Sequence, residues 1–352
     1  MQATSRRAGH SLFWPIMLIG LGLLWLLSSV GLLPGTDPSI LFQLWPLILI
    51  AVGLDLLWGR RSPETGGIIA LATLLLLLVF MWVGPALGLG GGQVVTERFT
   101  EPVDGASSAQ VELNLSSAVT RVFALEDDDQ LVDAEMRHAG RIDFSASGTD
   151  HRSIRLAYSS LGPGATFLGL GADLRWDIGL APEVPIDLRV DGRSGATTLD
   201  LELLALRSLV LDAGSGATAL ALPATDARYL VDVSGGSGAI RVSAADQSAL
   251  DLSARPGSGG MSLAFGQDAD ADVTLRSRSG AVSIEVPRGI EVRLEVQDRG
   301  SGRLNVPREL EQLRGDDRTG VWQSDGYEGA TSSVRITVES RGSGGITLRI
   351  GR

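Results

Sequence analysis

The sequence predicts three hydrophobic transmembrane helices followed by an all-β domain, a β-solenoid with rungs of about 21–22 residues. Three observations support this fold class. Residues 11–90 are dominated by apolar side chains and hold five of the seven tryptophans, the chain from Gln93 onward is polar and glycine-rich, and a Ser-Gly pair recurs there at near-constant spacing. We therefore divide the chain into a transmembrane region (1–92), the N-terminal part of a β domain (93–190), and regular Ser-Gly repeats with a C-terminal cap (191–352).

The transmembrane prediction rests on three apolar stretches, at about 11–33, 40–58 and 68–89. Each has roughly the 17–25 residues that a helix needs to cross a bilayer. Buried helices of a soluble core are the alternative, but three such stretches in succession disfavour it. A cleaved secretory signal or a twin-arginine signal is also disfavoured, because two more apolar stretches follow the first.

Arginine placement predicts the orientation of these helices. Arg6 and Arg7 precede the first stretch, Arg60 and Arg61 follow the second, and residues 34–39 between them have no basic side chain. The excess of positive charge on the cytoplasmic side therefore predicts a multi-pass protein of the bacterial cytoplasmic membrane. Three crossings would place the β domain outside the cytoplasm.

The first two stretches repeat one another at an offset of 31 residues. The pairs Trp14-Pro15, Leu18-Ile19 and Gly22-Leu23 recur as Trp45-Pro46, Leu49-Ile50 and Gly53-Leu54. Because glycine lets helices approach closely in lipid, we interpret the repeat as an antiparallel hairpin built from one duplicated helix. Asp55, the acidic residue inside these stretches, is a candidate functional group, but its position near Trp58 predicts contact with interfacial water.

The β-repeat prediction rests on Ser-Gly pairs at intervals of 21, 22, 21, 21, 22 and 42 residues, which begin at Ser194, Ser215, Ser237, Ser258, Ser279, Ser301 and Ser343. The fourth residue after each glycine is always aliphatic, as at Leu199, Leu220 and Val242. Alternating apolar residues predict strands with one buried face. The glycine is expected to supply a positive φ or a tight backbone approach at the corner.

Rungs of this kind are expected to stack at roughly 4.8 Å with parallel pairing. An antiparallel sandwich of hairpins is the alternative fold, and the equal intervals favour the solenoid. Toward the N-terminus, 111–115 and 180–190 are expected to form strands. Near the C-terminus, Pro307–Leu313 is expected to form one short helix, and Trp322 and Tyr327 to cover the open end of the solenoid.

Composition excludes several functions. The net charge of −11 argues against a nucleic-acid partner. The absence of cysteine excludes disulfides and thiolate metal sites, and none of the three histidines lies at ligand spacing from another. We predict no catalytic, cofactor-binding or metal-binding residue and no cofactor, and therefore no enzyme, because no serine lies in a G-x-S-x-G motif.

Two acidic groups are candidate cation sites. Residues 126–129 are acidic throughout, and Asp268, Asp270 and Asp272 would share one face of a strand, where carboxylate oxygens suit Ca²⁺. The repeat of calcium-binding β-rolls is missing, however. We interpret both groups as solvated surface.

The duplicated helix motif resembles the membrane region of LiaI- and LiaF-like bacterial proteins. The β part is similar to the toastrack domain of LiaF-like, PspC-related and adhesin-like proteins in the segments 111–118, 131–135 and 176–188 and in the Ser-Gly ladder. The short loops and the three-helix anchor depart from the family pattern.

The resemblance implies a role in envelope-stress signalling, because LiaF-like proteins restrain a sensor histidine kinase of a two-component system. It implies no catalytic residue. The expected partners are the lipid bilayer, a membrane sensor kinase or other membrane proteins, and a second copy of the chain. The alternative function is a surface adhesin or a module that binds envelope polymers.

Overall fold

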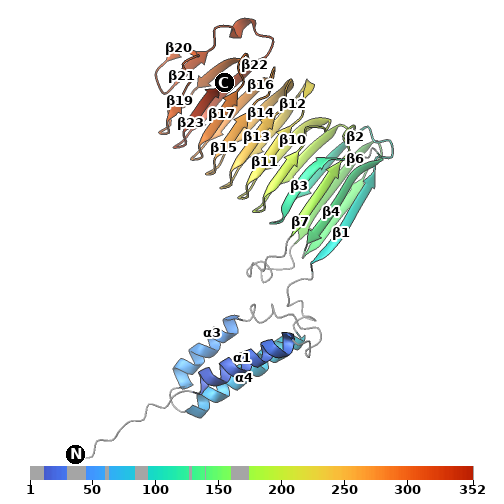
Figure 1. The fold of residues 1–352 in the computed structure, drawn as a ribbon, viewed down its shortest axis with the longest axis vertical. Coiled ribbons are helices and arrows are strands. Elements are labelled where there is room, and N and C mark those ends of the chain that lie inside the picture. The colour runs from blue at the N-terminus through green and yellow to red at the C-terminus, as the bar shows by residue number, and fades with distance from the viewer. Residues whose placement is uncertain are drawn as a thin grey trace, which may run out of the picture. The chain divides into compact units, whose positions relative to one another are not determined.

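The computed structural model describes residues 12–29, 45–59, 63–83, 94–126, 129–138, 140–159 and 174–351. The chain forms a helical unit and a β unit (Figure 1). The predicted limits 11, 30–33, 40–44 and 84–89 lie outside the described residues, as do the four arginines that predict the orientation.

The helical unit contains α1 (Phe13–Ser29), α3 (Trp45–Leu54) with its π-helical continuation η1 (Asp55–Gly59), and α4 (Pro63–Val83). The third helix begins at Pro63, earlier than predicted. Proline is favoured at the first helical position because the backbone N–H that it lacks would have no partner within the helix. Among the described residues, we find no helix with the length and apolar character needed to cross a membrane.

The two repeated helices both pack on α4 and have little contact with each other. The interpretation of an antiparallel hairpin is therefore wrong. A Cβ built on Gly20 would overlap the side chain of Leu74, so Gly20 provides the close approach, whereas Gly22 and Gly53 have no atom within 4 Å of such a Cβ. Asp55 is only 8% exposed, which corrects the expectation that it reaches interfacial water.

The β unit consists of two large sheets. Sheet A contains eleven strands in the spatial order β1 (Val95–Pro102), β4 (Gln130–His138), β7 (Arg175–Leu180), β3 (Val119–Ala124), β9 (Thr197–Asp200), β11 (Thr218–Leu222), β13 (Ile240–Ala244), β15 (Met261–Ala264), β17 (Val282–Val286), β23 (Ile346–Ile350) and β19 (Leu304–Asn305). Sheet B contains twelve in the order β20 (Glu311–Gly315), β21 (Gly320–Gln323), β18 (Glu291–Val296), β22 (Ser333–Arg341), β16 (Asp270–Ser277), β14 (Ser248–Arg255), β12 (Thr225–Ser234), β10 (Leu206–Asp212), β8 (Ile186–Asp191), β2 (Ser108–Asn114), β6 (His151–Ser159) and β5 (Arg141–Ser147).

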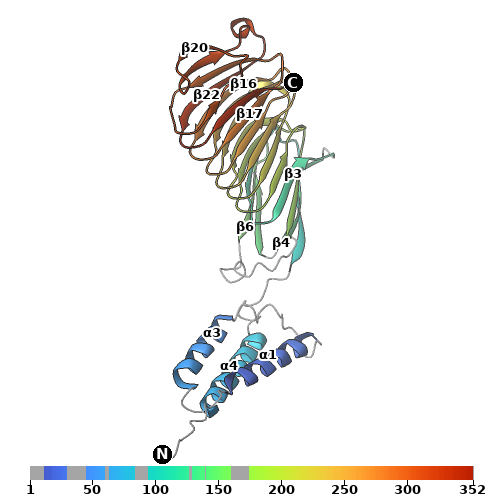
Figure 2. The same ribbon diagram turned by 60° about the vertical axis from the view of Figure 1, so that its left-hand side comes forward.

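We call one strand of sheet B and the sheet A strand that follows it along the chain a rung, as in β10 and β11. The strands of successive rungs lie side by side (Figure 2) and pair in parallel. In sheet A, for example, Thr218 pairs with Thr197 on one side and with Ile240 on the other. This pairing confirms parallel stacking and excludes the antiparallel sandwich. Antiparallel pairs involve β1, β4, β7, β5 and β6 at one end and β18, β20 and β21 at the other.

The core lies between the two sheets and follows the predicted alternation. Leu199, Leu220 and Val242 are at most 4% exposed, and the apolar residues of sheet B belong to the same cluster. Residues 180–190 hold two strands and not one, because Ala181–Pro185 separates β7 from β8.

The Ser-Gly corners need glycine for space and not for a positive φ. None of the seven corner glycines has a positive φ. A Cβ on Gly216 would overlap the carbonyl oxygen of Gly195 in the neighbouring rung, and Gly238 stands in the same relation to Gly216. Of the two roles predicted for the corner glycine, the tight backbone approach is therefore correct and the positive φ is not.

Both ends of the β unit depart from sequential stacking. The last rung, β22–β23, lies between β16–β17 and β18–β19, and the first, β2–β3, lies between β6–β7 and β8–β9. The predicted helix at 307–313 is wrong: a helix of seven residues is too short to be stable alone, and Glu311 instead begins a strand of the β20–β21 hairpin. Trp322 on β21 is nearly buried, as expected for a residue that covers the end of the sheet.

Candidate functional site

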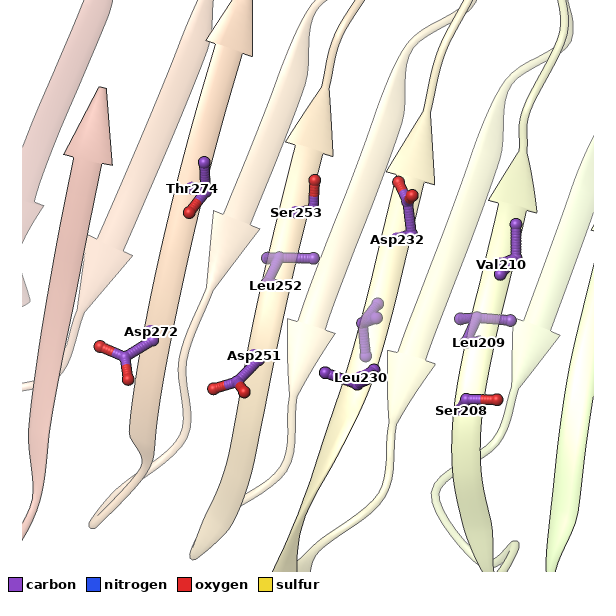
Figure 3. A pocket seen from close by; sticks show the side chains of 11 residues that line it. Ser208, Leu209, Val210, Leu230, Asp232, Asp251, Leu252, Ser253, Asp272 and Thr274 are labelled. Atoms are coloured by element: carbon purple, nitrogen blue, oxygen red, sulfur yellow. The ribbon is translucent and has the colours of Figure 1, made fainter. Parts of the chain in front are cut away.

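The outer face of sheet B carries side chains in straight rows, because its parallel strands stay in register. One row runs through Ser208, Leu230, Asp251 and Asp272, and the next through Val210, Asp232, Ser253 and Thr274. Figure 3 shows these residues on β10, β12, β14 and β16. Together they line a shallow groove of about 660 Å³, which we call the sheet B groove.

The centre of this groove is apolar. Leu230 is 62% exposed and Val210 is 38% exposed, because both stand on the solvent side of their strands. An exposed apolar pair bordered by polar groups makes this groove a candidate binding surface. It is also the feature that the sequence analysis missed; the signal was a leucine at an outward position of an alternating strand.

Arg228 organises the charges at one side of the groove. Its guanidinium lies 2.7 Å from Asp251, 2.5 Å from Asp270 and 3.2 Å from Asp272. Partial burial acts to lower the pKa of Arg228, but the hydrogen bond to Asp251 and the charges of the three carboxylates raise it overall. The cluster therefore holds a fixed cation among three anions.

Other ion pairs continue this pattern across the strands. Asp232 lies 2.6 Å from Arg255, and Asp272 lies 3.7 Å from Arg335. Tyr327 accepts a hydrogen bond of 3.0 Å from Arg335, which raises the pKa of that arginine. The rim of the groove thus combines hydroxyls with carboxylates that already have arginine partners.

The calcium candidates do not form a cation site. Asp270 and Asp272 do lie together, but Arg228 occupies the position between them, and Asp268 lies in a turn with a φ of 56°. Of the run 126–129, Asp127 and Asp128 lie outside the described residues. In the described parts of the chain, no three acidic or histidine side chains are placed to hold a metal ion.

One Ser-His-Asp contact exists on the opposite part of sheet B. Ser108 Oγ lies 2.7 Å from His151 Nδ1, and His151 Nε2 lies 3.4 Å from Asp150. His151 is 77% exposed and is simply the register neighbour of Ser108. Since catalytic hydrogen bonds act in sites that exclude water, this exposed contact does not define an active site.

Sheet A carries a second shallow groove of about 450 Å³ on its outer face. Its lining combines polar side chains, which include Thr198, Asp200, Arg241, Ser243 and Ser262, with small apolar ones such as Ala219 and Ala221. We call it the sheet A groove; among the described residues that line it, none has a large exposed apolar side chain like Leu230.

Family comparisons agree with the two units. Residues 13–93 match the LiaF transmembrane domain, and residues 91–243 match the N-terminal domain of toast_rack. Neither is an enzyme family. Comparison with curated proteins finds no significant match.

Among solved structures, the chain is similar to one described as a "putative cell adhesion protein" from Clostridium sporogenes, with 13% identity and a TM-score of 0.40 over 74% of this chain and 100% of that one. A likeness this weak carries no inference about function. The family matches confirm the resemblance inferred from the sequence: residues 13–93 are similar to a LiaF transmembrane domain, and residues 91–243 are similar to the N-terminal domain of toast_rack.

Proposed function

We propose that this protein is a non-enzymatic regulatory or scaffolding protein of the bacterial cell envelope, which binds another membrane protein through the sheet B groove. The exposed pair Leu230 and Val210 inside a rim of ion pairs is the observation that supports this most directly. Protein interfaces combine an apolar centre with a polar rim in this way.

The partner class follows from the resemblance to LiaF-like proteins: a sensor histidine kinase of an envelope-stress two-component system. The arginine distribution supports an extracytoplasmic β domain, so the contact would involve the extracytoplasmic part of the kinase. The rim carboxylates are already paired with arginines, so the apolar centre would supply affinity and the rim would set the register.

The test replaces Leu230 or Val210 by Glu in the full-length protein in its source bacterium. A carboxylate in the apolar centre should abolish photo-crosslinking of the partner to the groove. It should also release the kinase, which would be seen as increased phosphorylation of its response regulator. Leu203→Glu is the matched control, because Leu203 is 77% exposed and lies between β9 and β10, outside the groove. Groove variants that restrain the kinase as well as the control does would refute the proposal.

The sheet A groove favours a second candidate, an adhesin or envelope-polymer-binding module. Its hydroxyls, Asp200 and Arg241 could hydrogen-bond an anionic or hydroxyl-rich polymer. The full-length protein in nanodiscs should then sediment with purified cell-wall material, and Arg241→Ala should weaken this while Leu230→Glu leaves it unchanged. No sedimentation of the unaltered protein would exclude this candidate.

A further inference from the structure

The duplicated helices keep identical residues in a pattern that the structure explains. When residues 14–27 are compared with residues 45–58, seven positions are identical, namely Trp14/Trp45, Pro15/Pro46, Leu18/Leu49, Ile19/Ile50, Gly22/Gly53, Leu23/Leu54 and Leu26/Leu57. All seven are exposed on α1, and their counterparts on α3 and η1 are exposed or half-buried. Of the outward positions, Trp25/Leu56 is the pair that differs. The repeat has therefore kept the rest of the outward face of the helix.

The inward face differs at every position. The residues of α1 that pack toward α4 include Met17, Gly20 and Leu24, and at the offset of 31 they correspond to Ile48, Ala51 and Asp55. The helices thus meet α4 through similar positions but different side chains. Packing inside the chain cannot be the reason why the seven outward residues are the same.

Lipid contact is also an insufficient reason. Hydrocarbon accepts Leu, Ile, Val or Phe equally at an outward position, so lipid does not require the same residue twice. Lipid does not require a glycine either, and Gly22 and Gly53 both face open space, with no atom within 4 Å of a built Cβ. A partner surface of fixed shape does require glycine there, because small residues let two helix backbones approach.

We propose that the outward faces of α1 and α3, defined by these seven repeated residues, are two equivalent docking surfaces for a second copy of this chain. Each face holds both a ridge, Leu18-Ile19 or Leu49-Ile50, and a notch, Gly22 or Gly53, about one turn away. A face with a ridge and a notch one turn apart is complementary to itself, as the interface of a symmetric pair must be. A second copy carries the same face on both its α1 and its α3. It is therefore the partner that the duplication favours. The surface lies in the helical unit, so the proposal stands independently of the function proposed for the β domain.

The chain contains no cysteine, so single cysteines report contacts between copies without background. We would introduce Leu18→Cys or Leu49→Cys into the full-length protein, oxidise it in membranes and measure covalent dimer on a denaturing gel. Leu75→Cys is the matched control, because Leu75 is 67% exposed on α4 but belongs to no repeat. We expect dimer from the two repeat positions and little from the control.

A second variant tests the notch itself. Gly22→Leu combined with Gly53→Leu should lower the dimer yield of Leu18→Cys about tenfold, which corresponds to a loss of about 1.4 kcal/mol. Because both glycines face open space, the helices should still fold, and circular dichroism of the purified variant checks this. Equal crosslinking at Leu75, an undiminished yield after filling the notches, or capture of only a different membrane protein would each overturn the proposal.

Discussion

The two units of this chain repeat themselves in opposite ways. In the β unit, the residues kept from rung to rung point into the core, as with Leu199, Leu220 and Val242. Their outward neighbours on the same strands change freely, as with Thr198 and Arg241. In the helical unit, the outward residues are kept except at the exposed pair Trp25/Leu56, and the inward ones change.

The difference shows what each repeat is for. A rung cannot bury its apolar face alone, so stacking requires an apolar side chain at the matching inward position of each rung. The outer face is left free to acquire local features such as the sheet B groove. The duplicated helices bury different side chains on α4, so packing within the chain does not explain their shared outward face. We attribute that shared face to a contact outside the chain. The following substitutions test both halves of this contrast.

The largest effect is expected at the corner glycines. Gly216→Ala puts a methyl group against the carbonyl oxygen of Gly195, and backbone cannot move aside as a flexible side chain can. We expect a loss of about 4 kcal/mol in the free energy of unfolding, measured by urea denaturation. Gly329→Ala is the control, since nothing lies within 4 Å of its Cβ position. Equal losses in both variants would mean that close approach does not explain the corner.

A slightly smaller effect separates the two faces of sheet B. Leu252 is 2% exposed in the core, and Leu230 on the adjacent strand β12 is 62% exposed. Leu252→Ala should lower the free energy of unfolding by about 3 kcal/mol. Leu230→Ala should change it by about 0.5 kcal/mol or less while weakening partner capture. A large loss of stability at Leu230 would show that this leucine is structural and not part of a binding surface.

These inward positions are also the ones that the sequence predicts well. Alternation identifies Leu199 and Leu220 as core because burial on one face of a strand has a period of two. It could not place β22–β23 between two earlier rungs, because all rungs carry the same pattern and any of them can pair with any other. The candidate site was even harder to predict from the sequence. Arg228 contacts Asp251 and Asp270 across strands, and local spacing carries no information about that proximity. The burial of Asp55 likewise depends on helix packing that hydropathy cannot report.

A smaller effect is expected on the outer face, where residues are free to vary. Arg228 is 34% exposed, and removing it in Arg228→Gln should cost about 1 kcal/mol or less after screening by solvent. The variant leaves Asp251, Asp270 and Asp272 without their shared cation, and three carboxylates suit Ca²⁺. We therefore expect Ca²⁺ to raise the melting temperature of Arg228→Gln and not that of the unaltered protein. Equal stabilisation of both proteins would show that calcium binds elsewhere.

The smallest effect is expected in the β20–β21 hairpin, which belongs to no repeat. Asp316 accepts backbone hydrogen bonds from Thr319 at 2.8 Å and Arg318 at 2.9 Å, and these bonds, with help from Arg299, hold its pKa well below the usual value of 3.8. A carboxylate with a lowered pKa in the folded state adds stability above its ordinary pKa, and this contribution fades as the pH falls further toward the folded value.

Acid should therefore weaken the hairpin progressively below about pH 4, and Asp316→Asn should remove that part of the dependence. Hydrogen exchange of β20 and β21 between pH 5 and pH 2.5, corrected for intrinsic rates, measures this locally, and Asp325→Asn on the following turn is the control. Because β21 pairs with β18 outside the last rung, β22–β23, the stacked rungs should keep their protection while the hairpin loses it. If the hairpin and the rungs lost protection at the same pH, they would unfold as one unit. The last rung, β22–β23, would then not stabilise the stack without the hairpin.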